Sequence, residues 1–223
     1  MLIDFRAQIL PGVDDACPTH LVSIRRLLQA QRAGVDVLVA TPLLDLNQMP
    51  TDLFLKRCDV AAEHLELILQ PGMPRVVLGT EVLWQPELER QEDLSALCIG
   101  DGWLVLRLPE GKLTDMMIAS LRQLMHQVRG ILIMGVDQME YDDAQKLFAV
   151  GCKGELSFSA LTHRRERALW LPSLKNGDIA ALGRDPRDDT HAYHKLHKLP
   201  GKLDDTFEAV MHRAAAILQM EEK

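Results

Sequence analysis

The chain has 223 residues, of which 47% are hydrophobic, and its formal net charge is −7. This size predicts one domain over residues 1–223 with a sizeable core, and the negative charge argues against general nucleic-acid binding. No apolar run approaches the roughly 18 residues of a membrane span, and the N-terminus lacks the basic and apolar pattern of a signal peptide.

Strands and helices alternate along the chain. In the strand LIDFRAQ, the polar side chains of Asp4, Arg6 and Gln8 share one face because strand side chains have a period of two. A helix is expected over about 19–33, ending at Gly34. Further strands and helices follow: strand 35–42, helix 51–69, strand 75–81, strand 103–109, helix 112–128, strand 131–135, helix 142–150, strand 154–160, helix 161–171, strand 177–185 and helix 203–220.

This alternation predicts an α/β fold with a largely parallel sheet. The expected architecture is a closed or nearly closed TIM-like barrel of seven strand–helix units, (β/α)7, and the alternative is an open doubly wound sheet. No GxGxxG motif follows the first strand, and no GxxxxGK[ST] motif occurs, which argues against dinucleotide and P-loop folds.

Chemistry in barrels gathers at the carboxyl ends of the strands, so the residues there are the candidate site. The strand ends supply acids and arginines: Arg6 and Gln8 with Asp14 and Asp15, then Glu81, Arg107, Gly135, and finally Arg184, Asp185 and Arg187. None of these ends carries histidine or cysteine, the usual ligands of transition metals.

Short motifs in chain order carry a family resemblance. LIDFRAQILPGVDDA, VATPLLD, LGTE, LRLP, ILIMGVDQ and LGRDPR occur at the successive strand ends. The sequence resembles the bacterial PHP-domain (polymerase and histidinol phosphatase) tyrosine phosphatases of capsule and exopolysaccharide loci. In that family the corresponding motifs are IDxHxHILPGIDDG, ATPHH, GxE, LIEFP, IIAHPER and ASDAH. The resemblance implies a manganese-dependent phosphatase fold of the PHP type and a bacterial tyrosine kinase, or its tyrosine-rich tail, as partner.

Most metal-ligand positions that this resemblance implies are substituted here. Arg6 and Gln8 replace the first two histidines, Leu43 replaces the third, and Arg107 replaces an acid. Gly135 replaces a histidine, Gln138 replaces a phosphate-binding arginine, and Arg187 replaces the last histidine. Glu81 and Asp185 are the retained ligands. The resemblance therefore implies the scaffold of the family without most of its metal-binding residues.

The substitutions predict an inactive member without a metal cofactor. Two carboxylates could hold Mg²⁺ or Mn²⁺ weakly, but nearby guanidinium groups would repel the ion. The arginines could form a structural ion-pair network with the acids. Alternatively they could bind phosphate, and the candidates for this anion site are Arg6, Arg107, Arg184 and Arg187. The second interpretation predicts a regulatory, partner-binding pseudophosphatase.

Two other functions stay open at this point. An active metal-dependent phosphatase could use a rearranged site in which Glu81 and Asp185 are joined by Asp14 and by the loop histidines His191 and His194. The chain could also be a purely structural subunit of a larger assembly. The oligomeric state is not predicted.

The four cysteines are Cys17, Cys58, Cys98 and Cys152, and they form no CxxC pair. They predict reduced core residues in a cytoplasmic protein. None is followed by arginine at the CxxxxxR spacing of thiol phosphatases, which argues against that mechanism.

Overall fold

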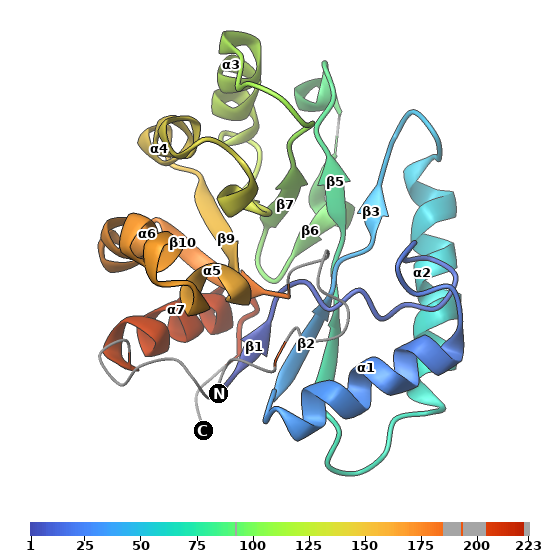
Figure 1. Ribbon diagram of the computed structural model, residues 1–223. Helices are drawn as coiled ribbons and strands as arrows, with labels where there is room; N and C mark the ends of the chain where they lie inside the picture. Colours follow the sequence, from blue (N-terminus) through green and yellow to red (C-terminus); the bar gives the residue numbers. More distant parts are fainter. Residues whose placement is uncertain (92, 185–192, 194–203, 221–223) are drawn as a thin grey trace.

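The computed structural model describes residues 1–91, 93–184, 193 and 204–220 (Figure 1). Its first sheet is parallel, in the order β1 (Ile3–Asp4), β2 (Val37–Ala40) and β4 (Arg75–Leu78). In the chain, the helix α1 (His20–Arg32) lies between β1 and β2, and the helix α2 (Thr51–Glu66) lies between β2 and β4. Both helices agree with the ranges predicted from the sequence.

The second sheet continues across the molecule and is also mainly parallel. Its order is β10 (Ile179–Gly183), β9 (Lys153–Ser157), β8 (Gly130–Ile133), β7 (Trp103–Arg107), β5 (Glu81–Leu83) and β3 (Leu43–Leu44). The short strand β6 (Cys98–Ile99), which the sequence did not predict, pairs antiparallel with β7. The remaining helices are α3 (Asp115–Leu124), α4 (Tyr141–Ala149), α5 (Phe158–Thr162), α6 (Arg164–Asn176) and α7 (Asp204–Ile217), with 3₁₀ turns η1 (Leu88–Arg90), η2 (Ser95–Leu97) and η3 (Val136–Gln138).

The sheets are not closed, so the closed or nearly closed TIM-like barrel expected from the sequence is not confirmed. The chain passes from the first sheet to the second between β2 and β3 and again between β4 and β5. In the described residues, β1 meets β10 through the backbone hydrogen bond from Phe5 N to Leu182 O (2.9 Å), and no ladder joins these two strands. The confirmed fold is therefore an α/β arrangement with mostly parallel, unclosed sheets.

Several strands are shorter than predicted, and in two of them a side chain engages the backbone where the strand ends. The Asp4 carboxylate accepts a hydrogen bond from Arg6 N (2.9 Å), and Gln8 has a φ of 48°, so the chain leaves the extended conformation before Gln8. The strand predicted over 154–160 ends at Ser157, whose Oγ accepts a hydrogen bond from Ala160 N (3.3 Å). This serine is the N-cap of α5, a helix that the sequence analysis missed.

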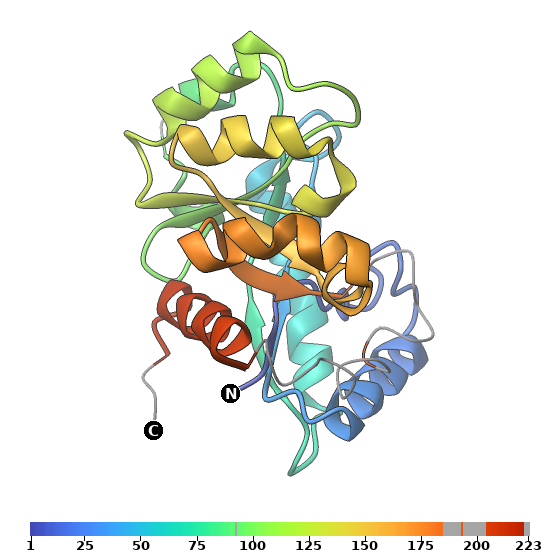
Figure 2. The same ribbon diagram turned by 60° about the vertical axis from the view of Figure 1, so that its left-hand side comes forward.

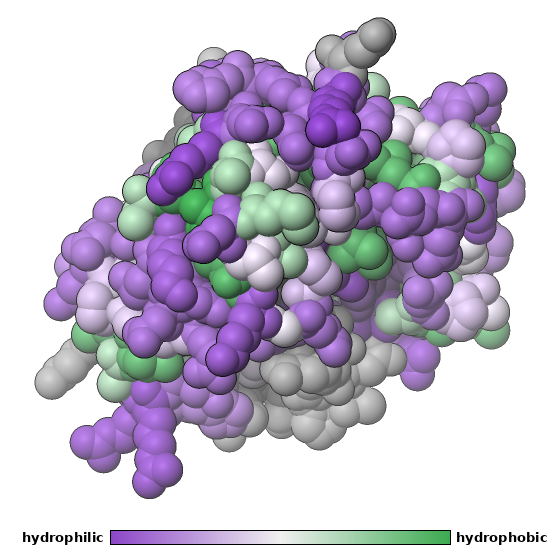
Figure 3. Space-filling view, turned by 90° about the horizontal axis from the view of Figure 1, so that it is seen from above, coloured by the Kyte–Doolittle hydropathy of each residue, from purple (hydrophilic) through white to green (hydrophobic). Residues whose placement is uncertain are grey.

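The core lies between the strands and the surrounding helices. Every residue of β2, β8 and β10 is buried, as expected for parallel strands covered on both faces. Figure 2 shows α3, α4, α6 and α7 side by side outside the second sheet. The face seen from above is mainly hydrophilic, with separate hydrophobic patches (Figure 3). Among the described helices, none is both long and apolar enough to span a membrane.

Candidate functional site

A buried ion pair lies at the centre of the site. Arg6 directly follows the extended start of the chain, and Glu155 lies in the middle of β9. The Arg6 Nη2 is 3.1 Å from Glu155 Oε2 and 3.9 Å from Glu81 Oε1, and the three side chains are almost completely buried. Burial opposes the charge of Arg6, but Glu155 and Glu81 raise its pKa above the ordinary value. Arg6 therefore serves as a fixed cation between two carboxylates.

A second arginine holds Glu81 from the other side. Arg107, the last residue of β7, donates from Nε to Glu81 Oε1 (2.8 Å) and from Nη2 to Glu81 Oε2 (2.7 Å). Both residues end up together because β5 and β7 are hydrogen-bonded neighbours. Glu81 is 2% exposed, whereas the Arg107 side chain is 35% exposed. The pair is bidentate, the geometry that suits a guanidinium and a carboxylate best.

Two glycines make room for the central pair. A Cβ atom on Gly135 would lie 3.1 Å from Arg6 Nη2 and 3.3 Å from Arg6 Nη1, and the φ of Gly135 is +66°. A Cβ atom on Gly183 would lie 2.8 Å from the Cβ of Arg6 and would collide with Glu155 Oε1. The glycine at position 135 is thus linked physically to the arginine at position 6, since a larger side chain would displace the guanidinium.

Burial raises the pKa of two carboxylates of the site. Burial raises the pKa of Glu155 to about 7, although Arg6 and the hydrogen bond from Gly135 N (2.7 Å) act in the opposite direction. Burial also raises the pKa of Asp14 to about 6, partly offset by the hydrogen bond from Leu10 N (2.8 Å) to its Oδ2. Both groups titrate nearer to neutral pH than ordinary carboxylates do.

Arg107 separates two pockets. The larger has a volume of 370 Å³ and includes Gln8, Asp14, Leu43 and Glu81 in its lining. The smaller has a volume of 180 Å³ and is lined by Arg6 and Arg107 together with Gly135 and Gln138. We call them the acidic pocket and the arginine pocket.

The structure brings most of the sequence-predicted residues to this region. Arg6, Gln8, Asp14, Glu81, Arg107, Gly135 and Gln138 line one pocket or the other, and so does Leu43, whose register partner is Glu81. Arg184 instead lies at the end of β10, 1% exposed, and its backbone N donates to Asp4 Oδ1 (3.0 Å). Asp185, Arg187, His191 and His194 lie outside the described residues.

Sequence reasoning missed Glu155, the partner of Arg6. A signal was present, because Glu155 is the one charged side chain of the predicted strand GELSFSA. A completely buried acid in such a strand needs a cation or a hydrogen-bond donor nearby. Asp137, just after β8, adds to this region: it accepts hydrogen bonds from Ser157 N (3.3 Å) and from Ser157 Oγ.

The described residues do not fit the metal cluster that the family resemblance implies. Within 1–91, 93–184, 193 and 204–220, no group of three or more His, Cys, Asp or Glu side chains is placed to hold a metal ion. The Glu81 carboxylate is already bound by Arg107 and faces Arg6. A divalent cation beside Glu81 would be repelled by the guanidinium groups of Arg6 and Arg107.

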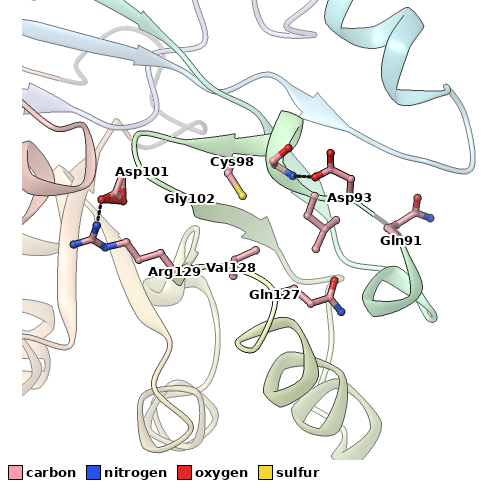
Figure 4. A pocket seen from close by; sticks show the side chains of 10 residues that line it. Gln91, Asp93, Cys98, Asp101, Gly102, Gln127, Val128 and Arg129 are labelled. Atoms are coloured by element: carbon pink, nitrogen blue, oxygen red, sulfur yellow. Dashed lines mark hydrogen bonds and ion pairs between the residues drawn. The ribbon is translucent and has the colours of Figure 1, made fainter.

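A third pocket, of 610 Å³, shares none of its described lining residues with the acidic pocket or the arginine pocket. It adjoins the amino ends of β7 and β8, and its lining includes Cys98, Gly102 and Val128. Figure 4 shows Arg129 and Asp101 pointing toward each other as an ion pair at one side of it. Burial raises the pKa of the Cys98 thiol, so this cysteine is not an activated nucleophile.

Comparison with solved structures identifies the fold. The chain is similar to a structure from a study of YwqE from Bacillus subtilis and CpsB from Streptococcus pneumoniae, described as metal-dependent tyrosine phosphatases. The TM-score is 0.74 at 17% identity, over 99% of this chain and 96% of that chain. A second match, N-isopropylammelide isopropylaminohydrolase from Burkholderia multivorans, has a TM-score of 0.41 at 13% identity, over 90% of this chain and 63% of that one. No protein-family model and no curated protein sequence matches the chain. The fold is thus that of the tyrosine phosphatase structure, as the sequence motifs predicted.

Proposed function

We propose that this chain is a non-hydrolysing pseudophosphatase that binds a phosphorylated partner. The observation that carries the proposal is the position of Arg6. Its guanidinium is buried between Glu155 and Glu81, on the fold of a metal-dependent phosphatase, and it occupies the space next to Gly135. A fixed cation there compensates the carboxylates without a metal ion, so the anions stay paired in the absence of the catalytic cluster.

The arginine pocket is the proposed anion site. Arg6 and Arg107 line it, Gln138 contributes an amide, and Glu110 is the one carboxylate among the described residues of its lining. Arg107 uses Nε and Nη2 to hold Glu81, and its side chain is 35% exposed. Its remaining Nη1 donor is suited to a phosphate oxygen that enters from solvent. A volume of 180 Å³ accommodates a phosphoryl group.

The similarity to tyrosine phosphatases suggests the kind of phosphate. We propose a phosphotyrosine segment of a bacterial tyrosine kinase as the partner, with a regulatory role in capsule or exopolysaccharide synthesis. Binding without turnover would protect or sequester the phosphorylated segment. The protein would need neither Mn²⁺ nor Mg²⁺ for this role.

Metal content and turnover test the loss of hydrolysis. The protein is purified with excess Mn²⁺, bound metal is quantified, and hydrolysis of an aryl phosphate is measured. We expect less than stoichiometric metal and no turnover above that of a Glu81→Gln control. Stoichiometric Mn²⁺ together with turnover that Glu81→Gln abolishes would instead establish an active enzyme with a rearranged metal site.

Peptide binding tests the anion site separately. A phosphotyrosine peptide and its unphosphorylated copy are titrated at low salt, because exposed charge interactions weaken as salt increases. We expect the phosphopeptide to bind more tightly, and Arg107→Met to reduce its affinity about tenfold, the loss of one charge-assisted hydrogen bond. The matched control is Arg90→Met, because Arg90 forms an exposed pair with Glu87 outside both pockets. Equal affinity for the two peptides would contradict phosphate recognition and favour a purely structural subunit.

A further inference from the structure

The acidic pocket is lined by more carboxylates than guanidinium groups, in contrast to the arginine pocket beside it. Its 370 Å³ lie between the PGVDD turn, β3 and the start of α2, and Arg107 forms the wall shared with the arginine pocket. Among the described residues, four carboxylates contribute to its lining, from Asp14, Asp15, Asp45 and Glu81, against two guanidinium groups. The two pockets therefore favour ligands of different charge.

The two cations of this lining are already engaged. Arg107 holds Glu81 through two hydrogen bonds. Arg57 donates from Nη2 to Gly12 O (3.0 Å). The carboxylate of Asp45 is also engaged, because it accepts from Asn47 N (3.0 Å), Gln48 Nε2 (2.8 Å) and Gln85 Nε2 (2.6 Å).

Asp14 and Asp15 are the carboxylates of the described lining that remain. Asp14 is 6% exposed, and the backbone donor Leu10 N binds its Oδ2. The adjacent Asp15 is exposed and adds a second negative charge. Glu81 and Asp15 raise the pKa of Asp14 beyond the effect of burial, whereas the guanidinium of Arg26 acts in the opposite direction. A bound cation would relieve the repulsion between these neighbouring carboxylates.

The rest of the pocket wall offers one unpaired acceptor and an apolar surface. The Oε1 of Gln8 is buried and has no hydrogen-bond partner among the described residues. Leu43 is 37% exposed, and Leu44, Met49 and Phe54 continue the apolar side. A ligand that matches this lining has a cationic donor at one end and a short hydrocarbon body.

We propose that the acidic pocket binds an alkylammonium group, from a lysine side chain of a partner or from a free polyamine. The ammonium contacts Asp14 and Asp15 and brings a donor to the Gln8 amide, while its methylene chain packs on Leu43 and Phe54. An alkylammonium supplies three donors on a flexible apolar stem, which suits this combination of acceptors and apolar wall. The proposal goes beyond phosphate recognition and does not depend on it.

Titration with n-butylammonium tests the site directly. The full chain is titrated at low salt and followed by calorimetry or by NMR shifts, with n-butanol as the uncharged control probe. We expect saturable binding of the amine and none of the alcohol. Asp15→Asn should weaken binding about tenfold, since it removes one charge-assisted partner, and Asp14→Asn should weaken it at least as much.

The variants are chosen so that a folding defect does not imitate the result. Asp15 is exposed, so Asp15→Asn should fold even if Asp14→Asn does not. Asp59→Asn is the matched control, because Asp59 is exposed on α2 and does not line the pocket. Absence of saturable amine binding, equal binding by Asp15→Asn, or competition by stoichiometric Mg²⁺ or Mn²⁺ would overturn the proposal.

Two further probes separate the sources of the ammonium group. Acetyl-lysine-methylamide, acylated at its α-amine, represents a lysine side chain, and spermidine represents a polyamine. Tighter binding of the lysine derivative assigns the pocket to a protein partner, and tighter binding of spermidine assigns it to a small molecule. Amine binding that persists in Arg107→Met, where phosphopeptide binding is weakened, would show that the two pockets act independently.

Discussion

Two arginine–glutamate pairs in this molecule have similar lengths and very different surroundings. Arg90 Nη1 lies 2.7 Å from Glu87 Oε1 on the surface, where the side chains are 72% and 65% exposed. Arg6 Nη2 lies 3.1 Å from Glu155 Oε2 in the interior, where they are 3% and 0% exposed. Exposed pairs stabilise a protein by at most about 1 kcal/mol. A buried pair is different, because removing one partner leaves an uncompensated charge in the interior.

The pair between Arg107 and Glu81 combines both situations. Its distance of 2.7 Å equals that of the surface pair, but Glu81 is 2% exposed while Arg107 is 35% exposed. One end of the pair thus belongs to the interior and the other to the arginine pocket. The burial of each partner, more than the distance between them, should therefore decide how far a substitution lowers the free energy of unfolding.

The largest effect is expected for Arg6→Ala. It should lower the free energy of unfolding by about 3–5 kcal/mol, because Glu155 and Glu81 both lose a buried counter-charge. Urea unfolding of the variant measures this change, and Arg90→Ala, which should stay within about 0.5 kcal/mol, is the control. A loss below about 1 kcal/mol for Arg6→Ala would mean that the central pair is not buried in solution.

The double variant Arg6→Met with Glu155→Leu sharpens the same comparison. It removes both charges and keeps apolar volume in their place, so its stability should exceed that of Arg6→Ala even though two residues are changed. Urea unfolding again gives the result. A double variant less stable than Arg6→Ala would indicate that Glu155 has an essential partner besides Arg6, such as the N–H of Gly135.

The titration of the Glu155 carboxyl group should be visible in the pH dependence of stability. Its pKa rises from an ordinary value of 4.5 to about 7 in the folded protein, so the folded state binds the proton more tightly than the unfolded state. Stability should therefore fall as the pH rises from 4.5 to 7 and should level off above that range. A shift of this size corresponds to an upper limit of roughly 3 kcal/mol.

Unfolding measured between pH 4.5 and 8 tests this expectation. Asp14, whose pKa rises to about 6, contributes in the same direction below that pH. Glu155→Gln should flatten the dependence of the free energy of unfolding on pH between pH 6 and 7. Only Asp14 then contributes, and most of its titration occurs at lower pH. An unchanged slope in Glu155→Gln would assign the titration to another group.

The sequence predicted the α/β class and the likeness to a phosphatase fold, but only half of the central site. The helices over 20–32 and 51–66 follow from apolar periodicity. Arg6 was a candidate because the family resemblance implies a ligand at its position in the motif. Glu155 was missed because its partner is distant in the sequence and becomes its neighbour only through strand packing. The closed or nearly closed TIM-like barrel is not confirmed, because ladder closure between the first and last strands depends on hydrogen bonds that no local pattern specifies.

A smaller effect is expected at Gly135. Gly135→Ala adds a Cβ in left-handed backbone and brings it within 3.1 Å of Arg6 Nη2, so we expect a loss of about 2 kcal/mol. The matched control is Gly12→Ala, at a φ of +72° against +66° but with nothing within 4 Å of the added Cβ, and its expected cost is about 1 kcal/mol. Urea unfolding measures the loss of stability in both variants, and the difference between the two losses is the cost of the contact with Arg6. Equal losses would mean that the guanidinium moves away freely.

The smallest effect on stability is expected for Arg107→Met, about 1 kcal/mol. Glu81 loses its bidentate partner, but Arg6 Nη2 remains 3.9 Å away and solvent reaches the vacated end of the pair. The methylene stem of methionine keeps most of the apolar contact of the arginine. The same variant should bind the phosphopeptide about tenfold more weakly. Thermal or urea unfolding then measures the role of Arg107 in stability, and peptide titration measures its role in phosphate binding. A stability loss as large as that of Arg6→Ala would show that Glu81 depends on Arg107 alone, and that the arginine pocket is a structural feature without a free donor.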